Sequence, residues 1–452
     1  STTVSSHETN TKNISNSNNI VTITSGGSVK VSSSNSQAVN FEKDSSTTTF
    51  LNQGTIIGGS DNSSVNVGLN QRGGATIETF TNEGIIGNGS SKFGVVVWGK
   101  SDNKSTINNF NNSGTIHSNN GESIYLGNAN VSTFTNSGAI QSNNREGINI
   151  RGGTTIDNFT NKGTISSNTG EAIYINNTNI RTFDNSKTIS SNNDKGINIG
   201  GGTTIETFNN SGTINSTGTI PSDNQGYTSG SVSIIGSKDS ITSITTFNNS
   251  GTISSEDIHG VNLRYTTIDN FTNSGIIKTN GTQGRGSPAF TDSGFRMTYA
   301  HVKTFENTGT ISGFMGVSLN GSKIDQFTNK QTIMATQDND SSFGIMIGAI
   351  NAGRENGTST IKTLKNEGII TSKGQGIVIS NKSKIETLIN NGTIQADKNG
   401  IMFHNYSNTV GPTDLDKITI GSNGIIKAGN DAIHIDGSEY DIVAQGIDVK
   451  SG

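Results

Sequence analysis

The chain lacks cysteine, holds only 3 prolines, and contains no long apolar run. Without cysteine it has neither a disulfide framework nor a thiolate metal site. A membrane helix needs about 20 consecutive apolar residues, so we expect no direct membrane insertion by this segment. The absence of disulfides suits an extracellular chain that crosses a pore unfolded, where a cross-link would be an obstacle.

Apolar residues are also scarce, at 29% of 452 residues, against roughly 45–50% in ordinary globular proteins. Charged residues make up 15%, and the net charge is −4. Disordered chains usually carry a high net charge and nucleic-acid binders a basic stripe, and neither description fits. Asn, Ser, Thr and 58 glycines fill the chain, so folding must depend on a few apolar residues that recur at a fixed period.

One pattern recurs through most of the sequence: a Phe or Leu, then Asn, Gly and Ile at every second position, as in Phe159-Asn161-Gly163-Ile165. Between Phe110 and Phe208 successive copies are spaced by 24 or 25 residues. An Ile or Val precedes the Phe, and an Ile-x-Ile segment such as Ile173-Tyr174-Ile175 follows. Each repeat therefore holds three short strands separated by Gly, Asn and Ser turns.

A repeat of about 24 residues with three strands corresponds to one coil of a solenoid, and the sequence predicts an all-β, right-handed parallel β-helix. The recurrent Phe, Asn, Gly and Ile share one parity, so they should all point inward. The density of Gly, Asn and β-branched residues argues against an α-solenoid, and a β-propeller blade needs about 40 residues.

The same parity predicts two structural columns along the axis. Phe should stack on Phe, and Asn should form an inward ladder that bonds the backbone and the Asn above and below. The predicted aromatic column comprises Phe80, Phe110, Phe134, Phe159, Phe183, Phe208, Phe247, Phe271, Phe305 and Phe327. The predicted amide column comprises Asn82, Asn112, Asn136, Asn161, Asn185 and Asn210.

The repeat also sets the expected boundaries. Residues 1–49 should form an N-terminal tail, frayed over 1–14, and a capping coil, and residues 50–437 the β-helix, with longer loops near 215–243, 278–300 and 335–358. Residues 438–452 form a C-terminal end without an obvious polar cap, so we expect the natural protein to continue beyond it. Ser1 is not an initiator Met, which indicates a processed or excised fragment.

The pattern Ile-x-x-Phe-x-Asn-x-Gly-Thr-Ile, seen at residues 156–165, resembles the passenger domains of autotransporters, the type V secreted proteins of Gram-negative bacteria. It is most similar to the Asn/Thr/Gly-rich adhesin and vacuolating-cytotoxin-like group, and the resemblance covers residues 50–435. It implies export through a C-terminal β-barrel and a place at the cell surface, anchored in the outer membrane, or in the medium. It also implies roles in adhesion, autoaggregation, biofilm formation and virulence.

Parallel β-helices also include polysaccharide lyases and galacturonases, so a polysaccharide-degrading enzyme is an alternative. Such sites need clustered carboxylates on one face. Asp431 and His259 resemble the acidic residue and the histidine of galacturonases. They occupy the repeat positions of Glu171 and Glu146, which we interpret as turn positions.

Two further motifs are weaker. Asp292-Ser293-Gly294 lacks the preceding Gly of serine-protease passengers. Asp338, Asn339 and Asp340 offer oxygen ligands, but a Ca²⁺ loop needs more of them at fixed offsets, and the six His show no metal-binding spacing. The sequence therefore predicts no catalytic residue, no cofactor and no metal.

The outward column of the Ile-x-Ile strand carries aromatic residues in a row. Such a row favours a contact surface, although Tyr and Val are also common strand residues. The candidate contact surface comprises Val96, Trp98, Tyr125, Asn149, Tyr174, Asn198 and Met346.

These observations favour a non-enzymatic passenger that mediates adhesion and self-association through an extended polar surface. The expected partners are a second copy of the chain and a host-cell or matrix glycan or protein, and nucleic acid is not expected. Two alternatives remain: a toxin-like passenger that oligomerises and acts on host cells, and the polysaccharide-degrading enzyme.

Overall fold

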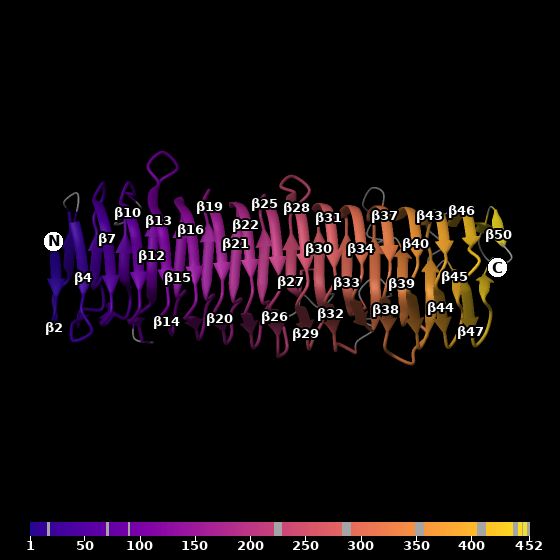
Figure 1. The fold of residues 1–452 in the computed structure, drawn as a ribbon, viewed down its shortest axis with the longest axis horizontal. Coiled ribbons are helices and arrows are strands. Elements are labelled where there is room, and N and C mark those ends of the chain that lie inside the picture. Colours follow the sequence, from indigo (N-terminus) through magenta and orange to yellow (C-terminus); the bar gives the residue numbers. More distant parts are fainter. Residues whose placement is uncertain are drawn as a thin grey trace. The chain divides into compact units, whose positions relative to one another are not determined.

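The structure is a computed structural model, and all of its described regular secondary structure is β-strand (Figure 1). It describes residues 1–15, 19–68, 72–88, 91–220, 228–282, 291–348, 357–404, 413–436, 442–444 and 446–449. Within these ranges no helix is long and apolar enough to cross a membrane.

The chain divides into two compact units, Ser1–Gly218 and Thr219–Gly452. Each unit is a solenoid of three parallel β-sheets, and a coil takes about 26 residues. The predicted parallel β-helix with three strands per coil is therefore confirmed. Short coils of 24 or 25 residues separate Asn112, Asn136, Asn161, Asn185 and Asn210, while insertions lengthen other coils to as many as 37 residues.

In the first unit every third strand along the chain belongs to the same sheet. Its first sheet contains β1 (Thr2–Val4), β4 (Asn19–Ile23), β7 (Ser46–Asn52), β10 (Thr76–Asn82), β13 (Ser105–Asn112), β16 (Ala129–Asn136), β19 (Thr155–Asn161), β22 (Asn179–Asn185) and β25 (Thr204–Asn210). Its second sheet contains β2 (His7–Glu8), β5 (Ser28–Lys30), β8 (Thr55–Ile57), β11 (Ile85–Gly87), β14 (Thr115–Ser118), β17 (Ala139–Ser142), β20 (Thr164–Ser167), β23 (Thr188–Ser191) and β26 (Thr213–Ser216). Its third sheet contains β3 (Lys12–Ile14), β6 (Val39–Phe41), β9 (Ser63–Val67), β12 (Phe93–Trp98), β15 (Ile124–Gly127), β18 (Ile148–Arg151), β21 (Ile173–Asn176) and β24 (Ile197–Gly200).

The second unit repeats this arrangement. Its first sheet contains β28 (Thr242–Asn249), β31 (Thr266–Asn273), β34 (His301–Asn307), β37 (Lys323–Asn329), β40 (Thr360–Asn366), β43 (Lys384–Asn390) and β46 (Thr413–Ile420), with β49 (Ile442–Ala444) and β50 (Ile447–Val449) both paired to β46. Its second sheet contains β29 (Thr252–Ser255), β32 (Ile276–Thr279), β35 (Thr310–Gly313), β38 (Thr332–Ala335), β41 (Ile369–Ser372), β44 (Thr393–Ala396) and β47 (Ile425–Ala428). Its third sheet contains β27 (Gly230–Ile235), β30 (His259–Arg264), β33 (Ser293–Thr298), β36 (Met315–Asn320), β39 (Phe343–Gly348), β42 (Gln375–Ile379), β45 (Ile401–Phe403) and β48 (Ile433–Ile435).

The aromatic column forms the core of the first sheet in each unit. All ten predicted Phe side chains are at most 1% exposed. From Phe80 to Phe208 the rings stack with centroids 4.6–4.9 Å apart and planes within 9° of parallel. This separation equals the spacing of hydrogen-bonded strands, so each coil adds one ring in register with the last. In the second unit Leu364 and Leu388 continue the column after Phe327.

The amide column lies beside the aromatic one and is buried throughout. Each Asn side chain bonds in three directions. Asn136 Nδ2 donates to Asn161 Oδ1 at 2.9 Å, to the carbonyl of Gly138 and to that of Thr164. The same geometry runs from Asn52 to Asn210, and from Asn249 to Asn390 in the second unit. Polar side chains can therefore be buried here because their donors and acceptors are satisfied by the next coil.

In most coils a glycine follows the amide column, where the backbones of neighbouring coils come close. A Cβ on Gly114 would lie 2.1 Å from the carbonyl oxygen of Gly84, one coil away. Such an approach is far inside van der Waals contact, so a side chain at Gly114 would force a local shift of the backbone. Lys187 and Gln331 occupy the equivalent position in two other coils.

Two predictions about boundaries are corrected. Residues 1–14 do not fray: β1, β2 and β3 form a coil in parallel register with the next, because Val4 and Ile14 are buried at 1% and 3% exposure. The predicted loops 215–243, 278–300 and 335–358 each contain a strand of the third sheet, namely β27, β33 and β39. Residues 221–227, 283–290 and 349–356 of those loops lie outside the described residues, as does most of 438–452.

Candidate functional site

The predicted contact surface lies on the third sheet, and only part of it is accessible. Trp98, Tyr125, Tyr174 and Asn198 are half-buried, but Val96 is 7% exposed and Asn149 is 2% exposed. The prediction that these two are exposed contact residues is wrong. An outward direction from a strand does not ensure exposure, because long side chains from neighbouring columns cover short ones.

Asn149 shows how this covering works. Its Nδ2 donates to Glu122 Oε1 at 3.3 Å, and its Oδ1 accepts from Arg151 Nε at 3.0 Å. The guanidinium of Arg151 also lies 4.7 Å from the ring centroid of Tyr174, in the range of a cation–π contact. Asn149 is thus buried among polar and aromatic side chains, and it connects Glu122 with Arg151 by hydrogen bonds.

Met346 belongs to a separate environment in the second unit. It is 2% exposed and forms a hydrophobic cluster with Met315, Phe343, Val378 and Met402. These side chains come from consecutive strands of the third sheet and cover one another. The prediction that Met346 is a contact residue is therefore wrong as well, because apolar neighbours on the same face remove it from solvent.

Trp98 and Tyr125 border a cleft of about 320 Å³. We call it the aromatic cleft and define it by Asn66, Phe93, Val96, Trp98, Glu122 and Tyr125. Trp98 and Tyr125 stack with ring centroids 4.9 Å apart and planes 22° from parallel. Burial raises the pKa of the Tyr125 hydroxyl, Arg151 opposes this shift and Glu122 adds to it.

A glycine makes this stack possible. Gly127 pairs with Trp98 in the sheet register, so a side chain there would occupy the space beside the indole. A Cβ on Gly127 would lie 2.9 Å from Cε1 of Tyr125, which shows that the tyrosine ring fills this space instead. The local sequence therefore holds two rings together at one wall of the cleft.

A column of carboxyl groups runs beside the aromatic residues. Glu122, Glu146 and Glu171 occupy equivalent positions two residues before the paired Ile124, Ile148 and Ile173. Glu146 is 8% exposed, and its Oε2 has no hydrogen-bond partner among the described residues. Burial raises its pKa to about 7, its own backbone amide and Arg145 oppose the shift, and the charges of Glu171 and Glu122 add to it.

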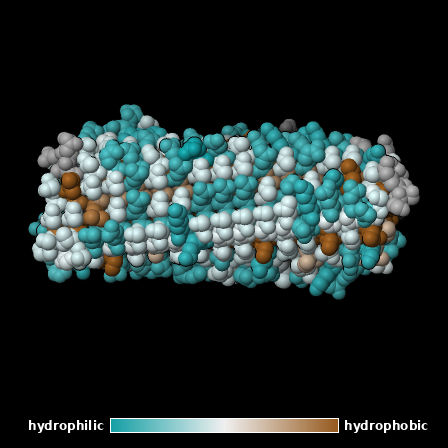
Figure 2. Space-filling view, in the orientation of Figure 1, coloured by the Kyte–Doolittle hydropathy of each residue, from teal (hydrophilic) through white to brown (hydrophobic). Residues whose placement is uncertain are grey.

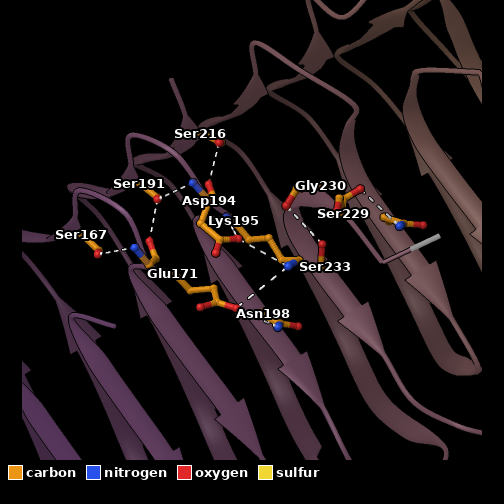
Figure 3. A network of polar contacts seen from close by, with 12 residues as sticks. Ser167, Glu171, Ser191, Asp194, Lys195, Asn198, Ser216, Ser229, Gly230 and Ser233 are labelled. Atoms are coloured by element: carbon orange, nitrogen blue, oxygen red, sulfur yellow. Dashed lines mark hydrogen bonds and ion pairs between the residues drawn. The ribbon is translucent and has the colours of Figure 1, made fainter. Parts of the chain in front are cut away.

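The column ends in an ion-pair network (Figure 3). Lys195 Nζ lies 4.0 Å from Glu171 Oε1 and 3.4 Å from Asp194 Oδ1, and Asn198 Nδ2 donates to the same Glu171 oxygen at 3.3 Å. Burial raises the pKa of Asp194, and Glu171 adds to the shift while Lys195 opposes it. Glu171 is thus held by a cation and an amide, whereas Glu146 has neither.

The interpretation of Glu146 and Glu171 as solvated turn residues is wrong for Glu146, because its side chain is buried. Glu146 lies two residues before β18, and its side chain is buried there. The signal that could have revealed the column is the recurrence of Glu at one repeat position in three consecutive coils.

His259 and Ser293 belong to two separate sequence motifs. The structure brings them together in the second unit. Both are fully buried, and the backbone amide of Ser293 donates to His259 Nδ1 at 3.0 Å. The Ser293 hydroxyl, however, donates to the Thr291 carbonyl and bonds Ser318 Oγ at 2.8 Å. His259 is therefore a buried residue instead of a turn residue, and the serine hydroxyl is not directed at the imidazole.

The remaining candidate residues, Asp431 and Asp338 to Asp340, belong neither to the carboxyl column nor to the His259–Ser293 pair. Asp431 is exposed and its Oδ2 bonds His434 Nδ1 at 2.8 Å. Asp338, Asn339 and Asp340 are exposed, and Asp340 pairs with Lys398. Among the described residues no group of three or more His, Asp or Glu side chains could hold a metal ion.

Comparison with protein-family models, curated proteins and solved structures finds no match for this chain.

Proposed function

We propose that this chain is a passenger-type β-helix that mediates adhesion and self-association at a cell surface, without catalysis. The observation that carries the proposal is the aromatic cleft, where Trp98 and Tyr125 stack beside the carboxylate of Glu122. Tyr and Trp are the residues most enriched at binding hot spots, and a concave site with few polar groups is the usual form of a ligand site.

A glycan fits the chemistry of this cleft best. The apolar face of a sugar ring can pack on the flat indole and phenol rings, while hydroxyl groups bond to the oxygens and amides of Glu122 and Asn66. The cleft's position on the outer side of the third sheet leaves one side open to a polymer.

The proposed self-association uses the polar columns of the solenoid. Figure 2 shows that hydrophilic and intermediate residues cover most of the face drawn, with hydrophobic residues in small patches. Among the described residues, exposed large apolar side chains, such as those of Ile85 and Ile276, are few. Each polar contact between two copies would contribute only about 0.5–1.5 kcal/mol, so association would require many coils at once.

The test is adherence of the full chain, coupled to inert beads, to glycan-coated surfaces. Replacing Trp98 and Tyr125 together by Ala should weaken retention at least about tenfold, as expected for a hot spot. The matched control is Thr135→Ala, which trims a half-buried outward residue of β16 on another sheet. Unchanged retention in the double variant would remove the cleft from the proposal. Bead clumping, followed in parallel, reports on self-association.

A second candidate, cleavage of a bound polysaccharide, is favoured by Glu146. A carboxyl with a pKa of about 7, placed between Glu122 and Glu171, has the protonation state that a general acid needs at neutral pH. Glu122 and Glu171 would serve as the anionic partners in such a site. Incubation with polysaccharides, followed by reducing-end analysis, separates the candidates: product formation that disappears in Glu146→Gln would favour the enzyme.

A further inference from the structure

A second, shorter ladder of amides lies on the outer side of the third sheet in the first unit. Asn13, Asn40 and Asn66 are register partners on β3, β6 and β9. Asn66 Nδ2 donates to Asn40 Oδ1 at 3.0 Å, and Asn40 Nδ2 donates to Asn13 Oδ1 at 3.0 Å. Asn40 is 2% exposed and Asn66 6% exposed, so these two amides are nearly as buried as the amide column inside the coils. We call this series the outer ladder.

The outer ladder stops at Asn66. In the next coil the register partner of Asn66 is Val96, which has no amide to continue the series. Each amide of the ladder donates to the preceding coil, so each carboxamide oxygen needs a donor from the coil that follows. Asn66 Oδ1 lacks this donor, and no residue that the structure describes forms a hydrogen bond to it. A largely buried amide with an open acceptor favours a bound partner that supplies the missing hydrogen bond.

The open oxygen belongs to the aromatic cleft, which Asn66 lines. Asn66, Val96 and Tyr125 are register partners on β9, β12 and β15. The acceptor, an apolar side chain and a phenol ring therefore follow one another along a single outward column, about 4.8 Å apart from coil to coil. The indole of Trp98 stacks on the Tyr125 ring and widens the aromatic part of this surface.

Two further polar side chains line the cleft without a partner. Ser63 is 2% exposed, and its Oγ forms no hydrogen bond with any described residue. Gln37 is half-buried, and no hydrogen bond joins its side-chain amide to the part of the chain that the structure describes. The Ser63 hydroxyl and Gln37 Nε2 can both donate. Open donors and an open acceptor thus lie around one cleft.

This combination is complementary to a secondary acetamide. The N–H of an acetamide donates, its carbonyl oxygen accepts, and its methyl group is apolar. The N–H would supply the hydrogen bond that the ladder lacks at Val96, and the methyl group would pack on the Val96 side chain. A hydroxyl group can also donate to Asn66 Oδ1, but it brings no apolar group to Val96. The volume of about 320 Å³ lies within the range of small-molecule sites.

We propose that the aromatic cleft recognises a sugar that carries an acetamido group, an N-acetylated hexosamine. The acetamido N–H donates to Asn66 Oδ1, the carbonyl oxygen accepts from Gln37 Nε2, and the methyl group packs on Val96. The sugar ring lies on the stacked rings of Trp98 and Tyr125. This inference rests on the proposed function, because it uses the same cleft and names the class of glycan that the cleft selects.

The experiment is calorimetric titration of the full chain with three β-1,4-linked oligosaccharides of equal length, made of N-acetylglucosamine, glucosamine or glucose. The three ligands differ only in the group at C2, which is an acetamide, an ammonium or a hydroxyl. We expect the N-acetylated oligosaccharide to bind about tenfold more tightly than the other two, since it alone adds both a hydrogen bond and a buried methyl group.

The decisive variant is Val96→Asn, because it extends the outer ladder by one amide that can donate to Asn66 Oδ1 in place of the ligand. Asn149 already stands in this outward column, one coil after Tyr125, so the position accommodates an Asn. We expect the variant to stay folded, as judged by its melting transition, and to bind the three oligosaccharides with similar affinity. The control is Val96→Ala, which leaves the acceptor open and should keep the preference for the acetamide.

The outcomes separate this inference from the proposed function. Equal affinity of the parent chain for the three oligosaccharides would overturn the acetamide assignment, and the glycan site would still stand if Trp98→Ala with Tyr125→Ala abolished the binding. Tightest binding of the glucosamine oligosaccharide would make an ammonium beside Glu122 the selected group and would also overturn the assignment. A preference that survives in Val96→Asn would show that Asn66 Oδ1 does not select the ligand. Binding that is unchanged in the Trp98 and Tyr125 double variant would overturn the cleft itself.

Discussion

The guanidinium of Arg151 lies over the ring of Tyr174, which stands one coil further along the third sheet, at 4.7 Å from the ring centroid. The same guanidinium bonds Asn149 through its Nε at 3.0 Å. One exposed side chain thus links an amide and an aromatic ring on neighbouring coils.

We expect the coupling between Arg151 and Tyr174 to be measurable. A double-mutant cycle of Arg151→Ala and Tyr174→Ala should give a coupling energy of about 0.5–1 kcal/mol in thermal or chemical unfolding. Arg151→Lys should lose nearly as much stability as Arg151→Ala. An ammonium cannot lie flat on the Tyr174 ring and bond Asn149 at the same time. Strict additivity of the two single variants would contradict this interaction.

The amide column should be the most sensitive polar element of the solenoid. Asn136→Ala removes three donated hydrogen bonds and leaves Asn112 Nδ2 without its acceptor at Asn136 Oδ1. We expect a loss of about 2–4 kcal/mol, from the missing bonds and because Asn112 Nδ2 keeps only its two longer bonds to backbone carbonyls. The exposed Asn144→Ala is the control, since it removes one surface bond to Asn120. Hydrogen exchange of β16 and β19 would measure both.

The aromatic column should tolerate Leu but not Ala. Phe159→Ala opens a cavity between two stacked rings and should cost about 3–5 kcal/mol of unfolding free energy. Phe159→Leu should cost less than about 1.5 kcal/mol, because the second unit already places Leu364 and Leu388 in this column. Equal losses in the two variants, measured by chemical denaturation, would show that ring stacking and not core volume determines stability.

The fold and its internal columns could be predicted from the sequence because they depend only on spacing and parity. A Phe repeated once per coil has to stack on its equivalent, and an Asn of the same parity has to be buried beside it. The strand β1 at the N-terminus was missed because its apolar marks, such as Val4, are short and lie among polar residues. The strand β33 was missed because Arg296 stands between Phe295 and Met297, where the repeat usually has a small or neutral residue.

The candidate sites were only partly predictable, because exposure depends on neighbours in three dimensions. Trp98 and Tyr125 were found from their column, but the burial of Asn149 follows from the reach of Glu122 and Arg151 across columns. The open oxygen of Asn66 has no sequence signal of its own, since it depends on which residue of the next coil stands beside Asn66.

Glu146 should give the protein a distinct pH dependence. Its pKa is raised from 4.5 to about 7 in the folded chain, so between these values the folded state keeps a proton that the unfolded state has released. The contribution of Glu146 to the free energy of unfolding should therefore be largest at low pH and fall as pH rises through this window, by at most about 3 kcal/mol. Asp194 shifts in the same direction, so part of the slope should remain when Glu146 is replaced.

The variant Glu146→Gln isolates this contribution, because an amide of the same shape carries no charge at any pH. Compared with the parent chain, it should unfold at nearly the same denaturant concentration near pH 5 and at a higher one near pH 8, where Glu146 is ionised in the parent. The exposed Glu83→Gln serves as the control and should leave the difference between the two pH values unchanged. A parent chain whose stability rises steadily from pH 5 to pH 8, with no gain in Glu146→Gln, would mean that the Glu146 carboxyl is ionised in the folded state, and the second candidate function would lose its general acid.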